Sequence, residues 1–288
     1  ATAFRAESSE SQPADRRVAL LRFSVLSVQV CLGVALTALA VSMTTAYLRL
    51  TEVNLGPAPD QTSFFSVRRS TGEAPTSAQS ADFNGQVISI LERVPGVEAV
   101  GFVDMFPPLG APAPFWRQGG GAESPRQATL PQFVSHDYFR TLGIPILFGR
   151  GFADSDRHGG SRVAVIDLEM ARRNWDSPAD AVNTQIRVRS QTATYEIIGV
   201  ADSFGAYWAR APIPTIYLSQ NQYPSNGGVA IVRLATGSST AGTMAFARDL
   251  LKAMPVRPIV SPATTLQAEW QATAARPRAR MLGMLLLG

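Results

Sequence analysis

The longest apolar run lies near the start of the chain. From Phe23 to Leu48, the sequence FSVLSVQVCLGVALTALAVSMTTAYL contains no charged residue. As an α-helix these residues would span roughly 39 Å, which exceeds the ~30 Å hydrocarbon core of a bilayer. A signal peptide has a shorter apolar region that ends in a small-x-small cleavage motif. The pattern therefore predicts a polar linker at residues 1–17 and a transmembrane helix at residues 18–50.

Small and polar residues within this run leave two interpretations open. Small residues four apart on a helix let two helices approach closely. The same residue types are also common in any membrane helix. The sequence does not decide between a helix–helix contact and ordinary composition for Gln29, Gly33, Thr37, Ala38 and Ser42.

After the apolar run come short segments in which strand-like and helix-like spacing of apolar residues alternate. Residues 62–69 (TSFFSVRR) and 97–103 (VEAVGFV) are rich in β-branched and aromatic side chains and predict strands. Between them, residues 81–94 (ADFNGQVISILERV) repeat apolar side chains at helical spacing and are closed by Pro95-Gly96. Together these segments predict a strand–helix–strand unit.

Predicted strands dominate the middle of the chain. Residues 107–126 are rich in Gly and Pro and predict a long irregular excursion. Helices gather near the two ends of residues 51–275, so we expect an α+β domain in which a mixed α/β lobe carries an inserted β-rich lobe. After residue 126 we expect strands at Gln132–Ser135, Pro145–Phe148, Arg162–Ile166, Gln185–Val188, Tyr195–Val200, 227–234 and 257–260, and helices at Tyr138–Leu142, Asp167–Trp175 and 241–254.

Composition favours a membrane component and argues against a nucleic-acid-binding surface. Charged residues make up 17% of the 288 residues, below the roughly 25% that is usual for soluble domains. The net charge is +4, and the arginines are scattered along the chain. We therefore expect no nucleic-acid partner, because such proteins gather their basic residues into a patch or stripe.

A second apolar run, MLGMLLLG, occupies residues 281–288. Arg276, Arg278 and Arg280 precede it, so residues 276–288 are predicted to begin a second transmembrane helix in a longer protein. The arginines before the first helix favour a cytoplasmic start, and long loops translocate largely regardless of their charge. Residues 51–275 are therefore expected to lie outside the cytoplasm.

The triplet Ser135-His136-Asp137 has the composition of a hydrolytic triad but not its spacing. A triad needs three side chains that converge, and adjacent residues point in different directions. No G-x-S-x-G elbow frames the serine. A strand end followed by a helical turn, capped by Ser135 or Asp137, explains the same letters. No catalytic residue is predicted here.

Two glycine-rich stretches suggest anion binding. Gly149-Arg150-Gly151 and Gly119–Ser124 both lack the strand–loop–helix context with a G-K-[ST] ending that cradles phosphates. The first is interpreted as a tight bend after a buried strand, and the second as a mobile loop. Without a Walker motif, the chain is not expected to hydrolyse ATP by that route or to bind a cofactor.

Metal-binding patterns are incomplete. Asp154, Asp156, His158 and Gly159 resemble the opening of a calcium loop, but the twelfth position holds Val165 in place of a bidentate Glu. Cys31 is the only cysteine and the chain has two histidines, which excludes the usual zinc sites and a disulfide within the chain. No metal site is predicted.

The order of the segments resembles the permeases of ABC transporters of the MacB/FtsX type, in particular the large acidobacterial orphan permeases with duplicated halves. The most specific parts are DYFRTLGIP with GRGF, and RVAVI with ARRNW. The resemblance covers almost the whole chain, through the segments LRFSVLSVQVCLGVALTALA, FNGQVISILERVPGVEAVGF, VSHDYFRTLGIPILFGRGFADSD, RVAVIDLEMARRNW, TYEIIGVADSF, PTIYLSQ and ARPRARMLGMLLLG.

The resemblance implies a two-lobed periplasmic core domain at residues 51–275 and a non-enzymatic permease in the bacterial inner membrane. A separate cytoplasmic ABC ATPase would supply the energy, and the membrane helices would transmit motion to the outer domain for efflux or mechanotransmission. Membrane lipid and either a periplasmic adaptor or a second permease half are the other implied partners. Under this resemblance, residues Ser135–Phe152 are scaffold that includes a buried run at Ile144–Phe148.

One segment departs from the family pattern, and two other functions stay open. The segment SPADAVN at residues 177–183 lacks the Gly of the usual D-P-[IL]-G turn, which is expected to shift the local turn. The alternatives are the sensor domain of a two-helix membrane receptor and a membrane-anchored enzyme. Sequence after Met281 would separate them, because a receptor needs a cytoplasmic signalling domain there, whereas a permease needs further membrane segments.

Overall fold

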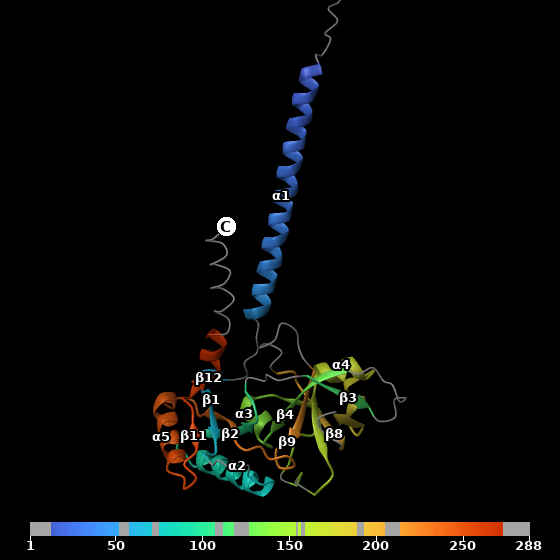
Figure 1. Ribbon diagram of the computed structural model, residues 1–288. Helices are drawn as coiled ribbons and strands as arrows, with labels where there is room; N and C mark the ends of the chain where they lie inside the picture. The colour runs from blue at the N-terminus through green and yellow to red at the C-terminus, as the bar shows by residue number, and fades with distance from the viewer. Residues whose placement is uncertain are drawn as a thin grey trace, which may run out of the picture. The chain divides into compact units, whose positions relative to one another are not determined.

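The computed structural model in Figure 1 divides into two units, residues 1–53 and residues 54–288. The predicted second transmembrane helix at 276–288, most of the linker at 1–17, and the loop at Gly119–Ser124 lie outside the described residues. The structure describes residues 13–51, 58–70, 75–106, 112–117, 127–153, 155–156, 159–188, 193–204 and 214–272.

The first unit is one long helix, α1, from Pro13 to Thr51. It begins earlier than expected, at a proline, which is favoured in the first turn because its missing N–H has no partner there. The stretch Arg22–Met43 is long and apolar enough to cross a bilayer, and its side chains are all exposed. The Ser27 and Thr37 hydroxyls donate to carbonyls one turn earlier, so these two polar groups are satisfied within the helix, as a lipid environment requires.

The second unit contains a mixed α/β lobe with two strand–helix–strand units. β10 lies between β1 and β2 and is antiparallel to both, and β11 lies on the other side of β1, which gives the order β11-β1-β10-β2. This is the ferredoxin-like arrangement of a split βαβ motif. The elements are β1 (Thr62–Arg68), α2 (Ser77–Glu92), β2 (Val97–Val103), β10 (Gly228–Leu234), α5 (Thr240–Lys252), β11 (Ile259–Val260) and β12 (Thr264–Thr265).

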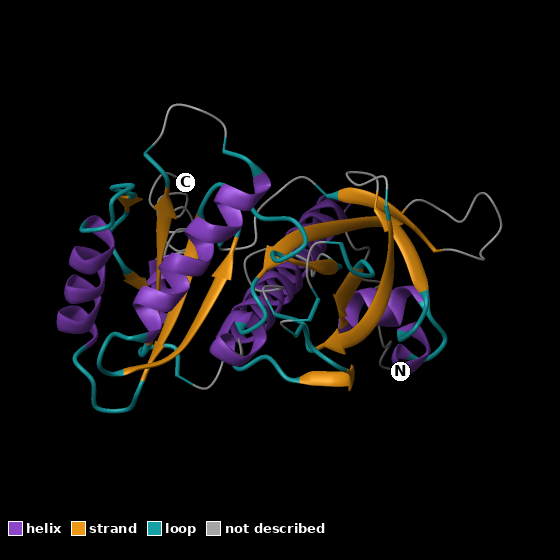
Figure 2. Cartoon of the chain, turned by 90° about the horizontal axis from the view of Figure 1, so that it is seen from below, coloured by secondary structure: helices purple, strands orange, loops and turns teal. Residues whose placement is uncertain are grey.

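A β-rich lobe is inserted between β2 and β10, as the sequence predicts. Its strands follow the order β4-β3-β7-β8-β6-β9, and a parallel pairing of β4 with β9 closes the ring. Figure 2 shows these strongly curved strands beside the α/β lobe. Closure leaves no free edge among these six strands. The elements are β3 (Ala113–Arg117), β4 (Gln127–Val134), α3 (Tyr138–Leu142), β5 (Ile146–Gly149), β6 (Val163–Asp167), α4 (Leu168–Asn174), the 3₁₀-helix η1 (Pro178–Ala181), β7 (Gln185–Val188), β8 (Thr194–Ala201) and β9 (Thr215–Ser219).

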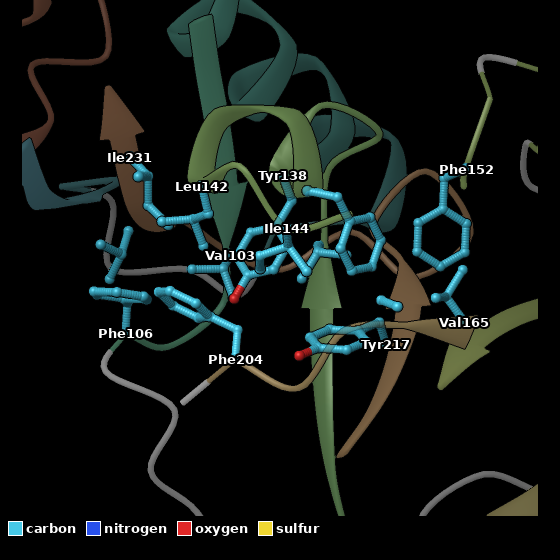
Figure 3. Close-up of a cluster of buried hydrophobic side chains, with 14 of the residues drawn as sticks. Val103, Phe106, Tyr138, Leu142, Ile144, Phe152, Val165, Phe204, Tyr217 and Ile231 are labelled. Carbon is cyan, nitrogen blue, oxygen red and sulfur yellow. The ribbon is translucent and has the colours of Figure 1, made fainter. Parts of the chain in front are cut away.

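Each lobe has its own apolar core, and a third core belongs to both. One core packs α2 and α5 against β1, β10 and β2, and another fills the interior of the β-ring. The third, called the shared core, gathers side chains from both lobes around α3 (Figure 3). Its members are Val103, Phe106, Val134, Tyr138, Phe139, Leu142, Ile144, Phe152, Val163, Val165, Ile198, Ala201, Phe204, Tyr217, Val229, Ile231 and Leu266.

Two sequence predictions need correction. The excursion at 107–126 contains β3, which pairs with β4 and β7 although Pro114 sits within it. Proline lacks a ladder donor and argues against an interior strand, so this strand was not predicted. The run Ile144–Phe148 is not fully buried, because Leu147 and Phe148 are 40% and 38% exposed. These two residues belong to β5, which pairs only with β8 among the described strands and so leaves its other side open.

Helix α2 starts at Ser77, earlier than the predicted residue 81. Thr76 accepts a hydrogen bond from the Gln79 backbone N–H, and the Gln79 side chain accepts one from the Thr76 N–H. This reciprocal capping box satisfies two amide groups that a helix start leaves without partners. The polar residues before Phe83 are therefore part of the helix.

Asp167 ends β6 and caps α4 from a buried position. Its carboxylate accepts hydrogen bonds from the backbone N–H groups of Met170 and Thr215. Burial nevertheless outweighs these bonds and raises the pKa of Asp167 to about 7. The folded protein therefore holds a proton between pH 4 and 7 that the unfolded chain releases near pH 4.

We predict that the free energy of unfolding falls as pH rises from 4 to 7, because the folded state alone binds this proton. Asp167→Asn should remove that slope, since Asn keeps an N-cap acceptor and does not titrate. At pH 8 the variant should be more stable than the parent by about 2–4 kcal/mol. Urea denaturation of both proteins from pH 4 to 8 measures the effect, and parallel curves would contradict it.

Candidate functional site

Ser135 joins the α3 segment to the end of β2. Its hydroxyl accepts a hydrogen bond from the Phe102 N–H at 2.9 Å, and its own N–H donates to the Phe102 carbonyl at 2.8 Å. The residue is buried. Gly101, next to Phe102, lets the Tyr138 backbone approach, because an added Cβ would lie 3.1 Å from its Cα. Ser135 therefore has a structural role in placing α3.

His136 and Asp137 do not complete a triad with this serine. The His136 Nε2 atom lies 3.0 Å from Asp137 Oδ2, and Arg140 Nε donates to Asp137 Oδ1 at 2.8 Å. The Arg140 hydrogen bond holds the pKa of Asp137 below its usual value. Asp137 is the N-cap residue of α3, but its side chain makes no capping bond. Of the two expected caps, Asp137 holds the N-cap position but its carboxylate binds Arg140, and the Ser135 hydroxyl binds the Phe102 N–H.

Gly149 forms the predicted tight bend at the end of β5, where this strand pairs with β8. Gly149 has φ 70°, and an added Cβ would lie 2.2 Å from the Ile198 carbonyl oxygen. Gly199, which pairs with Gly149, has the same constraint against the Arg150 carbonyl oxygen, also at 2.2 Å. The Arg150 N–H donates to Ile198 at 2.9 Å. This amide is already bonded to backbone, which argues against an anion cradle.

The role of Gly199 was missed from the sequence, although a signal was present. TYEIIGVA otherwise reads as a continuous strand, and a glycine inside such a run marks a bulge or a close backbone approach. The ladder between β5 and β8 indeed shifts register between Ile146 and Phe148.

Arg150 forms an ion pair with Asp156, one of the acidic residues of the calcium-like loop. The guanidinium donates to both carboxylate oxygens, at 2.8 and 3.1 Å, and the Ala153 N–H adds a third hydrogen bond. Burial alone would raise the pKa of Asp156, but these bonds outweigh it and the pKa is lowered.

The rest of the calcium-like loop gives no support for a metal site. Asp154 and His158 lie outside the described residues, and Val165 is buried in the shared core. Among the residues that the structure describes, no group of three or more His, Cys, Asp or Glu side chains could hold a metal ion.

The segment SPADAVN keeps a left-handed turn without glycine. Asn183, its last residue, has φ 64°, and its N–H donates to the Ile197 carbonyl at 2.8 Å. Asparagine tolerates this conformation better than most residues other than glycine. The turn joins η1 to β7.

Two surface hollows accompany these elements. One, of about 590 Å³, lies between α2 and α5 and is lined by Ile90, Leu250 and Met254 among others. The other, of about 480 Å³, borders Arg150 and Glu196. Neither lining contains a histidine or cysteine, so neither hollow offers one of these common nucleophiles or bases.

The described ends of the second unit meet on one strand. β1, the first strand of the unit, pairs with β11 and β12, the last two. The Gln267 N–H donates to the Pro59 carbonyl at 3.3 Å, which links the outgoing chain directly to the incoming chain. The incoming and outgoing parts of the chain are therefore both attached at β1.

Gly149→Ala is predicted to destabilise the domain by about 3 kcal/mol or more, because the new Cβ meets backbone rather than a movable side chain. Gly237→Ala is the matched control, since Gly237 has φ 89° but nothing within 4 Å of an added Cβ. The control should lose only about 1–2 kcal/mol, the cost of the left-handed backbone. Equal losses in urea denaturation would contradict a steric role for Gly149.

The model of the family of MacB-like periplasmic core domains matches residues 28–250, more than half of the chain. No curated protein sequence matches this chain. The periplasmic region of MacB from Actinobacillus actinomycetemcomitans is similar in structure, with a TM-score of 0.50 and 12% identity, over 78% of this chain and 97% of that one.

The extracellular domain of the noncanonic ABC-type transporter YknZ from Gram-positive bacteria gives a TM-score of 0.45 and 16% identity, over 69% of this chain and 100% of that one. The MacB likeness supports the fold, and the family match covers part of α1, the β-ring and the α/β lobe up to residue 250. The chain therefore belongs to the family of MacB-like periplasmic core domains, and with its apolar N-terminal helix it is a membrane protein of the transporter permease type that carries an extracytoplasmic domain.

Proposed function

We propose that this chain is part of a bacterial inner-membrane permease that couples ATP hydrolysis by a separate cytoplasmic ATPase to movement of its extracytoplasmic domain. The movement would act in efflux or mechanotransmission. The observation that carries the proposal is the meeting of both domain ends on β1. A domain held in this way follows a displacement of its membrane segments.

The length of α1 supports transmission across the membrane. Its 39 residues correspond to roughly 58 Å of helix, nearly twice the ~30 Å hydrocarbon core. The helix continues for eight residues beyond Met43, from residue 44 to Thr51. A continuous helix transmits an axial or rotational displacement better than a flexible linker does, because its backbone hydrogen bonds fix its length.

The construction of the domain supports movement as one body. The shared core contains Val229 and Ile231 from the α/β lobe together with Val165 and Tyr217 from the β-ring. Close-packed interiors have low compressibility and transmit strain. A displacement applied to β1 through its ladder with β10 therefore reaches both lobes.

The partners and the absence of catalysis belong to the same proposal. A permease of this kind needs an ABC ATPase on the cytoplasmic side, lipid around Arg22–Met43, and a periplasmic adaptor or second permease half outside. The proposed role requires no chemistry in the domain. In agreement, Ser135, His136 and Asp156 are engaged in structural contacts.

Membrane topology provides the first test. Single cysteines replace Thr236, in an exposed turn of the domain, and Ser9, before α1, in a Cys31→Ala background. An impermeant thiol reagent should label Thr236→Cys in intact cells but leave Ser9→Cys unlabelled. Both should react after permeabilisation, which controls for accessibility. Labelling of Ser9→Cys alone would place the domain in the cytoplasm and refute the proposal.

Energy coupling provides the second test. The full-length permease, tagged and purified from native membranes after cross-linking, should retain a protein with Walker motifs. ATP hydrolysis by that complex should exceed hydrolysis by the isolated ATPase at least about twofold, as expected when partner binding favours the competent state. A correctly oriented domain that retains no ATPase and shows no response to ATP would instead favour a receptor.

A further inference from the structure

The last part of the described chain lies along β1 as a strap. We define the strap as residues 259–272, which comprise β11, a connecting stretch, β12 and a final helical segment at 266–272. It follows α5 after a turn in which Arg257 has φ 45°. In Figure 1, β11 and β12 lie beside β1.

The strap is held by two short ladders, by the bond from the Gln267 N–H to the Pro59 carbonyl, and by Val260 and Ala263, which pack against the core of the α/β lobe. β11 and β12 contribute two residues each to the ladder with β1. Between them, the Ser261 N–H donates to the Ser66 carbonyl, and the Ser66 N–H donates to the Ser261 hydroxyl. Leu266 is the only buried residue within 259–272, at 1% exposure, whereas Ile259 is 60% exposed.

The opposite side of β1 is held much more firmly. β1 and β10 pair continuously from Thr62 with Arg233 to Val67 with Gly228, and β10 pairs in turn with β2. Phe65 and Val67 pack beneath α2 and α5 in the core of the α/β lobe. The two sides of one strand therefore differ sharply in strength, so the strap is the first element expected to separate from β1.

The register makes separation easy in one particular direction. β12 is antiparallel to β1, and Ser63 pairs with Thr265 near the start of β1 and the end of β12. The incoming and outgoing chains therefore leave the ladder at the same end. Pulling them apart unzips the ladder one pair at a time, whereas a pull along the strands would stress all pairs together.

We propose that the strap is a detachable clasp that peels from β1, with β12 leaving first, while the rest of the domain stays folded. Leu266 is its anchor, since this side chain is buried in the shared core, against which Phe64 also packs. While the clasp is closed, a displacement of the outgoing chain reaches β1, and once it has peeled, the outgoing chain moves relative to β1 without unfolding either lobe. Only its driving force rests on the proposed function, because the weak attachment is a property of the domain itself.

Hydrogen exchange on the full-length protein in a lipid nanodisc tests the clasp. Peptides from residues 259–272 should exchange at least about 100-fold faster than peptides from β10, because they open without global unfolding. A disulfide between Ser63→Cys and Thr265→Cys, in a Cys31→Ala background, should slow exchange in the strap to the rate of β10. Paired residues in an antiparallel ladder lie at a distance that a disulfide can bridge.

Two controls separate the effect of the disulfide from the effect of the cysteine substitutions themselves. The same double variant under reducing conditions retains both cysteines without the bond, and it should exchange as the parent does. Ala99→Cys with Arg233→Cys places a disulfide between β2 and β10, away from the strap, and it should leave the strap unchanged. Strap exchange as slow as that of β10 in the parent would overturn the clasp.

Addition of ATP to the complex with its ATPase distinguishes the two proposals. Faster strap exchange with ATP, lost in the oxidised Ser63→Cys/Thr265→Cys protein, supports both the clasp and its driving force. Local opening that ignores ATP supports the clasp and contradicts the proposed coupling. A strap that opens only with global unfolding contradicts the clasp, whatever the topology and ATPase measurements show.

Discussion

Burial of Tyr138, Phe139 and Leu142 between the two lobes is the constraint on which the rest of the domain depends. These residues of α3 lie in a core that takes side chains from the ferredoxin-like sheet on one side and the β-ring on the other. Neither lobe could keep its facing side chains dry without this wedge. Ser135 fixes its position through two hydrogen bonds to Phe102, and Gly101 gives it room. The triplet that resembles a catalytic motif is therefore part of the joint between the lobes.

Local sequence patterns predicted the individual helices and strands better than the pairing between strands. Period and flanking turn residues located α2, α5, β2 and most strands of the ring, and they indicated an inserted β-rich lobe. The closure of that ring was not predicted, because the pairing of β4 with β9 joins Leu130 to Thr215 across more than eighty residues. No local pattern encodes such a register. β3 was missed for a different reason, since Pro114 contradicts the usual signature of an interior strand.

For the candidate site, the sequence mainly argued against a catalytic triad, an anion-binding loop and a metal site. The structure then showed which contacts these residues make. The incomplete spacing of the triad and of the calcium loop could be read directly from the sequence. The close approach of Gly149 and Gly199 depends on the pairing of β5 with β8, which are far apart in the sequence. The ion pair of Arg150 with Asp156 depends on how the loop between them folds. The conclusion that both ends of the domain share β1 also required the fold. Membership of the MacB-like family gives these structural roles a functional setting, because such a domain is attached to membrane segments.

The place of the insertion has a consequence for how such permeases diversify. β2 ends at Val103, which pairs with Val229 near the start of β10, so the β-ring begins and ends at neighbouring positions of one sheet. A short hairpin can bridge the same two points. The ring is thus an insertion in a smaller sheet, and evolution can exchange it for another insertion that covers the same shared-core side chains, while β1, with its attachments to the preceding and following chain, stays as it is. Relatives can in this way present different surfaces to their surroundings while they keep the same α/β lobe.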